Sequence, residues 1–401
     1  MPDVARLGDR SLFPDLDARA YLAHAALSPP SIPVRRAVIA SMSDIGRRAA
    51  GYFPDALAQR GRTRARFASL VGAAEDEVAL TMNTTQGVVD VALCLPWRAG
   101  DRVVCFTGEF PANVTPWQRA AALFDLDLVF VPADLFRTDP DRAWEAFDRA
   151  IAGGARLVAA SAVQFQTGFR MPLRALSDAA RAKGAELFVD GIQACGGTPI
   201  DVTADGIDYL ATGSHKWLMG LEGVGFVYAR RELARRFRPH VAGWLGHPDP
   251  FAFLSQGEGL LRYDKPLRDA VDVFEQGTFN AAGCVAIEAS MSLLADLGVE
   301  AIHAHANRYL DALEPLLVAR GFRSLRATDP AGRSCILGAR PPGGTVGAWA
   351  RALAQRGVVV STPDGALRFA PHWPNALAEV PLVVEAIDDA IRADPALTVK
   401  P

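Results

Sequence analysis

Residues 206–228 read GIDYLATGSHKWLMGLEGVGFVY. Two short apolar runs flank a turn of small residues and a glycine-rich link, and Lys216 lies between the two runs. A buried ammonium group is costly, so a lysine in such a place is usually paired, neutral or covalently used. This segment alone leaves two interpretations open: an ordinary lysine on a surface loop, or a lysine whose amine forms a Schiff base with an aldehyde.

Short apolar runs of this kind recur through the first part of the chain. Helix-length segments separate most of them, as at 86–95, 113–124, 140–152 and 173–183. This alternation predicts an α/β fold with a mainly parallel seven-stranded sheet that is covered on both faces. The last two runs are too close together for a helical crossover, so one strand is expected to be antiparallel. The seven predicted strands are 77–81, 101–106, 126–131, 156–163, 186–190, 208–212 and 224–229.

The chain has 401 residues, a length typical of two or three domains. We predict an N-terminal arm at 1–20, a large domain at 21–275 and a smaller α+β C-terminal domain at 276–401. In the C-terminal domain a long helical pattern begins at residue 281. Short strand-like runs and a final helix at 376–393 follow it.

Composition narrows the class of protein. The net charge of −3 gives no sign of binding to nucleic acid or to an anionic membrane. The five cysteines are scattered, without a CxxC pair, so neither a disulfide framework nor a zinc site is predicted. No apolar run reaches membrane-spanning length, and the N-terminus has no apolar core of signal-peptide type. We therefore expect a cytoplasmic enzyme.

Two histidines, His303 and His305, are the nearest approach to a metal motif. They are two residues apart on a predicted helix, and such residues do not share a helical face. We interpret both as ordinary surface positions and predict no metal site.

Ligands of parallel sheets bind beyond the carboxyl ends of the strands, so the residues that follow each strand are informative. After the first strand, Thr84 and Thr85 open a helix whose free N–H groups suit a phosphate, although a plain N-cap is the alternative. After the second strand, Phe110 is a candidate for core packing or for stacking on a flat ligand.

Asp190 ends a very apolar strand, where an unpaired carboxylate would be expensive. It needs a partner such as a protonated ring nitrogen, an arginine or a helix N-terminus. The 26 residues from Asp190 to Lys216 form one excursion, which brings the two side chains to opposite sides of one crevice. Arg368, between Leu367 and Phe369, is a candidate clamp for a substrate carboxylate or a member of a structural ion pair.

Each of these signals is modest alone, but together they describe one kind of site. They provide a phosphate cradle, a stacking ring, an acid at a strand end, a lysine and a carboxylate clamp. Those are the parts that a pyridoxal phosphate (PLP) enzyme needs.

Nearly the whole chain resembles the class V aminotransferase family of fold-type I PLP enzymes. This family includes cysteine desulfurases, selenocysteine lyases, kynureninases and isopenicillin N epimerase. The resemblance rests on Tyr21-Leu22, Ala25-Ala26, Asn83-Thr84-Thr85-Gln86-Gly87, Glu109-Phe110-Pro111-Ala112-Asn113, Pro116-Trp117, Val189-Asp190-Gly191, Gln193, Ser214-His215-Lys216-Trp217, Gly277-Thr278, Arg368, Pro371-His372 and Asn375.

The resemblance implies a role for each candidate. Lys216 would hold the cofactor and later shuttle the α-proton, and Asp190 would keep the pyridine nitrogen protonated. Phe110 would stack on the ring, and Arg368 would bind the α-carboxylate of a small amino acid. The residues around the phosphate and the ring oxygen would be Thr84, Thr85, Gln193, Ser214 and His215.

The family's active sites lie at a dimer interface, so the resemblance also implies a homodimer. Thr278 would then reach the phosphate bound in the neighbouring subunit.

The type of reaction is less closely defined. Desulfurases carry a nucleophilic cysteine on a loop before the carboxylate-binding arginine, whereas residues 358–365 are a short loop without cysteine. The nearest cysteine, Cys335, falls in a predicted strand, so a desulfurase is disfavoured. Transamination needs no further specialised group and is expected first. A C–S or C–N β-lyase and an amino-acid epimerase stay open, and a non-enzymatic relative is disfavoured.

Overall fold

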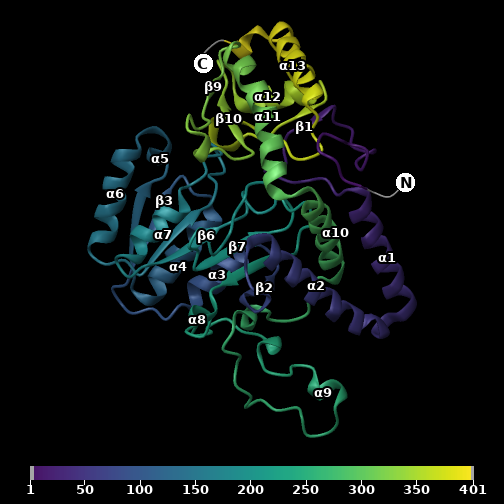
Figure 1. The fold of residues 1–401 in the computed structure, drawn as a ribbon, viewed down its shortest axis with the longest axis vertical. Helices are drawn as coiled ribbons and strands as arrows, with labels where there is room; N and C mark the ends of the chain where they lie inside the picture. Colours follow the sequence, from purple (N-terminus) through teal and green to yellow (C-terminus); the bar gives the residue numbers. More distant parts are fainter. Residues whose placement is uncertain (1–3, 399–401) are drawn as a thin grey trace.

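A computed structural model describes residues 4–398 of the chain. Seven strands form the central sheet, in the order β2-β8-β7-β6-β5-β3-β4 (Figure 1). All seven predicted strands are confirmed, and β8 is the antiparallel one, paired with both β7 and β2. The strands are β2 (Val78–Thr81), β3 (Arg102–Thr107), β4 (Asp127–Pro132), β5 (Leu157–Ser161), β6 (Glu186–Asp190), β7 (Tyr209–Gly213) and β8 (Gly225–Ala229).

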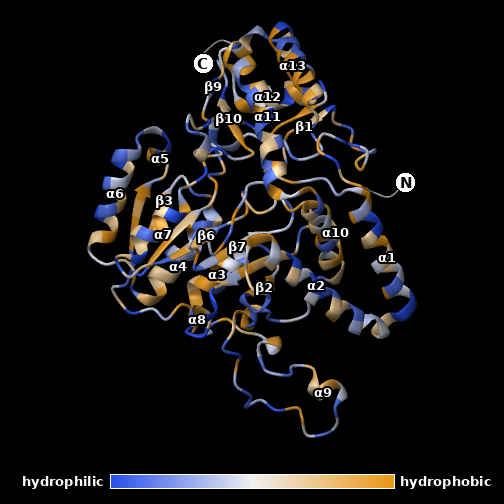
Figure 2. Ribbon diagram, in the orientation of Figure 1, coloured by the Kyte–Doolittle hydropathy of each residue, from blue (hydrophilic) through white to orange (hydrophobic). Residues whose placement is uncertain are grey.

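Both faces of this sheet are covered, because successive side chains of a strand point to opposite faces. In β6, Leu187 and Val189 belong to one apolar cluster, and Phe188 belongs to the other. Figure 2 shows the resulting band of apolar strands in orange. The first cluster includes α2 (Phe53–Val71), α6 (Pro140–Ala152), α7 (Leu173–Arg181) and α10 (Ala281–Leu297), and the second includes α3 (Thr84–Cys94) and α4 (Thr115–Phe124).

The C-terminal part has its own smaller apolar core, as predicted for an α+β unit. Its antiparallel sheet has the order β12-β10-β9, and a separate parallel pair joins β11 to β1 near the N-terminus. Its elements are α11 (Val299–Val318), α12 (Val346–Ala354), α13 (Val380–Ala393), β9 (Arg323–Ser324), β10 (Leu337–Arg340), β11 (Val358–Val359), β12 (Leu367–Phe369) and β1 (Ala20–Tyr21).

One long α-helix and three short ones remain in the described part of the chain. α10 packs on α2 and on α1 (Ile32–Arg48), which begins one residue before Pro33. Proline is tolerated there because its missing N–H has no helical partner in the first turn. The predicted boundaries at 20/21 and 275/276 stay predictions, and residues 1–3 and 399–401 lie outside the described range. The short helices are α5 (Leu135–Thr138), α8 (Arg231–Ala234) and α9 (Ala252–Ser255).

Within residues 4–398 no single helix is both long and apolar enough to cross a membrane. Only α10 and α11 taken as a pair satisfy both requirements, and a bend of 77° separates them. Much of the apolar surface of both helices packs inside the fold, as at Ile287 and Leu294 in α10 and Leu310 in α11.

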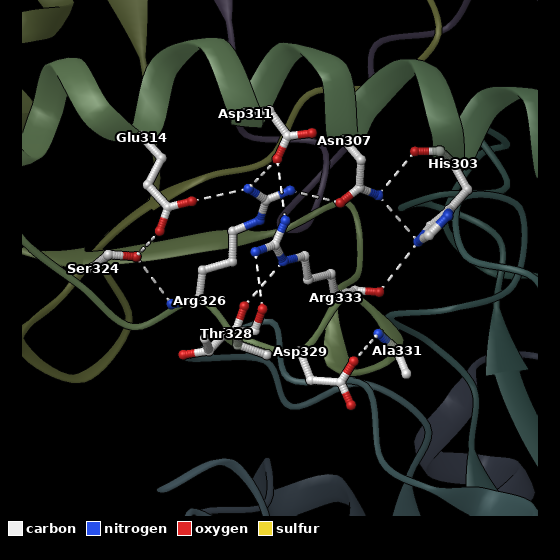
Figure 3. A network of polar contacts seen from close by, with 11 residues as sticks. His303, Asn307, Asp311, Glu314, Ser324, Arg326, Thr328, Asp329, Ala331 and Arg333 are labelled. Carbon is white, nitrogen blue, oxygen red and sulfur yellow. Dashed lines mark hydrogen bonds and ion pairs between the residues drawn. The ribbon is translucent and has the colours of Figure 1, made fainter.

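A network of charged side chains fastens the loop after β9 to α11 (Figure 3). The side chain of Arg326 is only 2% exposed, and its guanidinium contacts Asp311 at 2.6 Å and Glu314 at 2.9 Å. It also donates to Asn307 Oδ1 at 2.7 Å. Because Arg333 shares Asp311, at 3.4 Å, both ends of the loop are fixed to one helix.

The interpretation of His303 and His305 as ordinary surface residues is wrong. His305 is buried, and its Nε2 lies 2.7 Å from the carbonyl oxygen of Asn375. His303 is partly buried and lies 3.2 Å from the carbonyl oxygen of Arg333 (Figure 3). Both rings therefore join α11 to neighbouring loops. No group of three or more metal-ligating side chains occurs in the described part of the chain.

Candidate active site

The predicted site residues follow strands that end at one edge of the central sheet. β3, β5, β6 and β7 run parallel, and β2 has the same direction because β8 is antiparallel to both β2 and β7. The carboxyl ends of these strands therefore lie together. The residues that follow them include Thr84, Phe110 and Lys216, while Asp190 is the last residue of β6.

Lys216 lies in a tight turn after β7 whose backbone is fixed on several sides. The carbonyl of His215 accepts from the N–H of Ser28 at 2.8 Å, and the carbonyl of Lys216 accepts from Met219 at 2.9 Å. Met219 itself has a φ of +53°, an uncommon left-handed conformation for a residue with a side chain. The Lys216 amine lies 5.7 Å from the centre of the Phe110 ring.

Burial lowers the pKa of Lys216 below its usual value. The nearby Asp190 acts in the opposite direction, and Arg368 adds to the lowering. A lysine with a lowered pKa offers more of the neutral amine at neutral pH, which is the form that attacks a carbonyl carbon. His215 has a lowered pKa for similar reasons, burial and the charge of Lys216.

Asp190 is buried and only partly satisfied. Its Oδ1 accepts from the N–H of Ile192 at 2.9 Å, while its Oδ2 has no hydrogen-bond partner among residues 4–398. Burial raises its pKa, and Lys216 partly counteracts this. An unfilled buried acceptor is costly, so this oxygen is suited to an N–H donor brought by a ligand.

Glu109 is a second buried carboxyl, which the sequence analysis named within a motif but gave no role. It accepts from the N–H of Ser161 at 2.8 Å, from Gln164 at 3.0 Å and from Asn113 at 3.3 Å. Burial raises its pKa, and its charge in turn raises the pKa of Asp190. The available signal was its place beside Phe110, directly after a strand.

The start of α3 is the segment for which a phosphate cradle is predicted. Thr84 is buried and Thr85 is exposed, and Asn83 caps the helix by accepting from the N–H of Gln86 at 2.9 Å. The earlier N–H groups of the first turn have no acceptor within the helix, which suits an anion.

Two glycines bring this helix start close to the lysine turn. A Cβ at Gly87 would lie 2.5 Å from the side chain of Val227, so α3 sits directly on the sheet. A Cβ at Gly213 would lie 3.1 Å from the hydroxyl of Thr84 and 3.5 Å from the ring of His215. The predicted phosphate ligands Thr84 and His215 are thus brought together.

Two other predicted ligands are engaged within the protein. Gln193 accepts from the indole N–H of Trp217 at 2.8 Å and donates to the carbonyl of Ala25 at 3.1 Å. The hydroxyl of Ser214 donates to the carbonyl of Leu221. Both side chains hold the lysine turn in place, and their roles toward a cofactor stay predictions.

Arg368, in β12, is buried with 5% exposure and forms no ion pair within residues 4–398. Its guanidinium donates to Ser361 Oγ at 2.9 Å and to the carbonyl of Phe165 at 2.8 Å. Burial lowers its pKa to about 10. Phe165 also meets the Phe110 ring edge-on, with centres 5.4 Å apart, so this arginine belongs to the same site.

Thr278 lies elsewhere. It is exposed, on the wall of a cavity of about 760 Å³ that Met82 and Gln86 also line. Met82 and Gln86 lie on either side of Thr84, the first residue of α3. This cavity is therefore next to the predicted phosphate cradle.

His372 ties the strand of Arg368 to the turn of Lys216. Its Nδ1 accepts from the backbone N–H of Trp373 at 2.7 Å, so its Nε2 carries the proton and donates to the carbonyl of Trp217 at 2.9 Å. The ring is fully buried, and burial lowers its pKa to about 4. His372 lies four residues after Arg368, and its partner Trp217 lies one residue after Lys216. This hydrogen bond therefore fixes the position of Arg368 relative to Lys216.

The residues present fit PLP. The unfilled oxygen of Asp190 suits the N–H of a pyridinium, the first turn of α3 suits a phosphate, and the amine of Lys216 suits an aldehyde. The ring of Phe110, 46% exposed beside that amine, offers a face for stacking. Fold and site together define an enzyme that holds an aldehyde cofactor on a lysine.

Comparison with known proteins identifies the family. The model of the aminotransferase class-V family matches residues 40–368, so the chain belongs to that family and is a PLP-dependent enzyme.

Three similar proteins have been assigned different reactions. An uncharacterised aminotransferase of Bacillus subtilis (strain 168) is 28% identical over 94% of this chain and 96% of its own length. The isopenicillin N epimerase of Streptomyces clavuligerus is 26% identical over 82% of this chain and 83% of its own. The solved cystine C-S lyase C-DES has the same fold, with a TM-score of 0.83 and 20% identity over 94% of this chain and 99% of its own.

The buried His372 predicts a loss of stability in acid. Its folded pKa lies below its unfolded value of about 6.5, so only the unfolded chain binds the proton between these values. Stability is therefore complete above pH 6.5 and falls by about 3 kcal/mol as the pH drops toward 4. His372→Gln, which can still donate to Trp217, should lose about 3 kcal/mol less over this range.

The measurement is urea unfolding of both proteins at pH 7.5, 6, 5 and 4.5. His24, the other buried histidine with a strongly lowered pKa, is present in both proteins, and because burial is the main cause of its shift and the charge of His372 the smaller one, most of its contribution cancels. Parallel loss of stability in the two proteins would contradict the assigned protonation of His372.

Proposed function

We propose that the protein is an aminotransferase that acts on a small amino acid. The observation that carries this proposal is the buried guanidinium of Arg368, which has no counterion among residues 4–398 and lies near the amine of Lys216. A buried cation without a partner is expensive unless a ligand supplies the opposite charge. A carboxylate matches the fork of an arginine and is common to all amino acids.

Arg368 would position the substrate rather than take part in bond making. Ser361 and the carbonyl of Phe165 each take one N–H of the guanidinium, which leaves the other N–H groups for the α-carboxylate. Because both partners are fixed, the arginine needs little reorganisation when substrate binds. This preorganisation would place the α-carbon beside Lys216.

Lys216 and Asp190 would divide the proton chemistry. PLP, when bound, acts as an electron sink that stabilises negative charge at the α-carbon. Asp190 would accept a hydrogen bond from the ring nitrogen through its unfilled Oδ2, and Glu109 behind it would strengthen the negative field. Lys216, released when the substrate amine replaces it, would take the α-proton as a base, a role that its lowered pKa supports.

A persulfide route is disfavoured by the cysteines. Residues 361–365, before Arg368, contain no cysteine. Cys335 is buried, and its thiol donates to the carbonyl of Gly197 at 3.0 Å. Burial also raises its pKa to about 12, so the thiolate needed for sulfur transfer is not available at neutral pH.

We also propose that the enzyme works as a homodimer. Thr278 faces an open cavity beside the phosphate cradle, and the segment around α9 extends away from the rest of the chain (Figure 1). That segment exposes Leu254, Leu261 and Tyr263, the last by 91%. Large exposed apolar side chains are typical of surfaces that bind a partner.

Sedimentation of the PLP-loaded enzyme tests this assembly. A particle of twice the 42.8 kDa chain mass is expected at micromolar concentration. A catalytically active particle of one chain mass would contradict the proposal.

The first test of the reaction is the visible absorption of the PLP-loaded protein. An added amino acid should bleach the band, and a keto acid should restore it. Lys216→Ala should lose covalent attachment of PLP, whereas the exposed Lys183 is a matched control whose change to alanine should have no effect. Covalent PLP on the Lys216→Ala protein would refute the role of Lys216. A persistent band while keto acid and ammonia or sulfide accumulate would indicate a β-lyase instead.

Arg368→Gln should reduce kcat/KM by about 100-fold or more, since charge-assisted hydrogen bonds contribute about 1.5–3 kcal/mol each. Arg323→Gln, which changes an exposed arginine of the same small sheet, should leave kcat/KM within about twofold. Steady-state rates with several amino acids measure this. Equal losses in the two variants would show that Arg368 does not bind the carboxylate.

A further inference from the structure

A second cavity, far from the candidate active site, is lined by four arginines. It has a volume of about 550 Å³ and lies at the opposite edge of the central sheet, where β5 and β6 begin. We propose that this cavity binds a phosphate-type oxyanion carrying two or more negative charges. The lining residues are Pro96, Arg98, Asp101, Arg156, Gly184, Glu186, Arg236 and Arg238.

The charges of this cavity are unbalanced. Four guanidinium groups face two carboxylates, which leaves a surplus of two positive charges in a chain whose net charge is −3. The arginines come from separate segments: the loop after α3, the start of β5 and the chain after α8. Like charges brought together by the fold repel one another unless an anion compensates them.

Glu186 compensates for two of these arginines. Its carboxylate contacts Arg156 at 2.6 Å and Arg236 at 3.1 Å, and it also accepts from the hydroxyl of Tyr209 at 2.8 Å. Even so, Nη2 of Arg156 is buried without a hydrogen-bond acceptor in the described part of the chain. Glu186 therefore already serves three donors, while Nη2 of Arg156 still lacks an acceptor.

The other two arginines have no counterion. Asp101 Oδ2 accepts from the backbone N–H of Arg98 at 2.9 Å, but no described residue bonds the guanidinium of Arg98. The guanidinium of Arg238 is also without a partner in residues 4–398, although its backbone N–H donates to Cys94 at 2.8 Å. Two guanidinium groups without a counterion on the wall of one cavity are suited to bind phosphoryl oxygens.

The lining also limits the class of ligand. Pro96 and Gly184 are the only uncharged residues on it, and no aromatic ring is available for stacking on a nucleobase. A ligand made only of charged and polar groups, such as pyrophosphate or a small phosphate ester, matches these walls.

This site is separate from the phosphate cradle. Glu186 is the first residue of β6 and Asp190 is the last, so the cavity and the candidate active site are about 13 Å apart along that strand alone. The inference therefore does not depend on the proposed reaction. PLP already bound at α3 would not compete with an anion here.

Calorimetric titration of the PLP-loaded protein with inorganic pyrophosphate tests the proposal. We expect one saturable site per chain beyond the cofactor, weakened at least tenfold by Arg238→Gln or Arg98→Gln. Arg235→Gln is the matched control, because it removes an equal charge from an exposed neighbour outside the cavity, and it should change the affinity less than twofold.

Glycerol phosphate and inorganic phosphate, titrated in parallel, distinguish a phosphate ester from a free oxyanion as the preferred form. Absence of saturable binding, or equal weakening by Arg235→Gln and Arg238→Gln, would overturn the proposal. Retention of full affinity when Arg98 and Arg238 are both changed to glutamine would do the same.

Discussion

The candidate active site depends on opposite charges that the fold holds together away from bulk water. Asp190 and Glu109 supply two carboxyls, and Lys216 and Arg368 supply two cations. Each of these groups is costly to bury alone, and each shifts the pKa of a neighbour. Because the acids come from the large sheet and Arg368 from the small one, the balance exists only when both parts of the chain are in place.

Backbone contacts maintain that balance. Both ring nitrogens of His372 bond to the main chain. One bonds to Trp373 in the segment that follows Arg368, and the other bonds to Trp217 in the turn of Lys216. Gln193, through Trp217, adds a second connection to the same turn. These residues do not need to touch a substrate to matter, because an error in the position of Lys216 relative to Arg368 would misplace the α-carbon.

The sequence predicted the sheet correctly and made several buried charged groups conspicuous, for reasons that are local. Strand runs such as 186–190 are apolar and bounded by turns, and the cost of an unpaired acid made Asp190 conspicuous. What could not be predicted depends on tertiary partners. The sequence offers Gln193 and Ser214 as ligands, but only the fold reveals that Trp217 and Leu221 already occupy their polar atoms. Likewise His305 has the spacing of a surface residue, and the approach of Asn375 buries it.

The pairing of β1 with β11 has a consequence for how the protein is made. Residues 20–21 leave the ribosome early, yet their partners at 358–359 are among the last tenth or so of the chain. The seven strands of the central sheet, which end at Ala229, are complete long before that. The large sheet can therefore form during synthesis, as domains generally do, whereas the N-terminal segment must wait. Arg368 follows still later, so a nascent chain carries Lys216 and Asp190 well before it can hold a carboxylate.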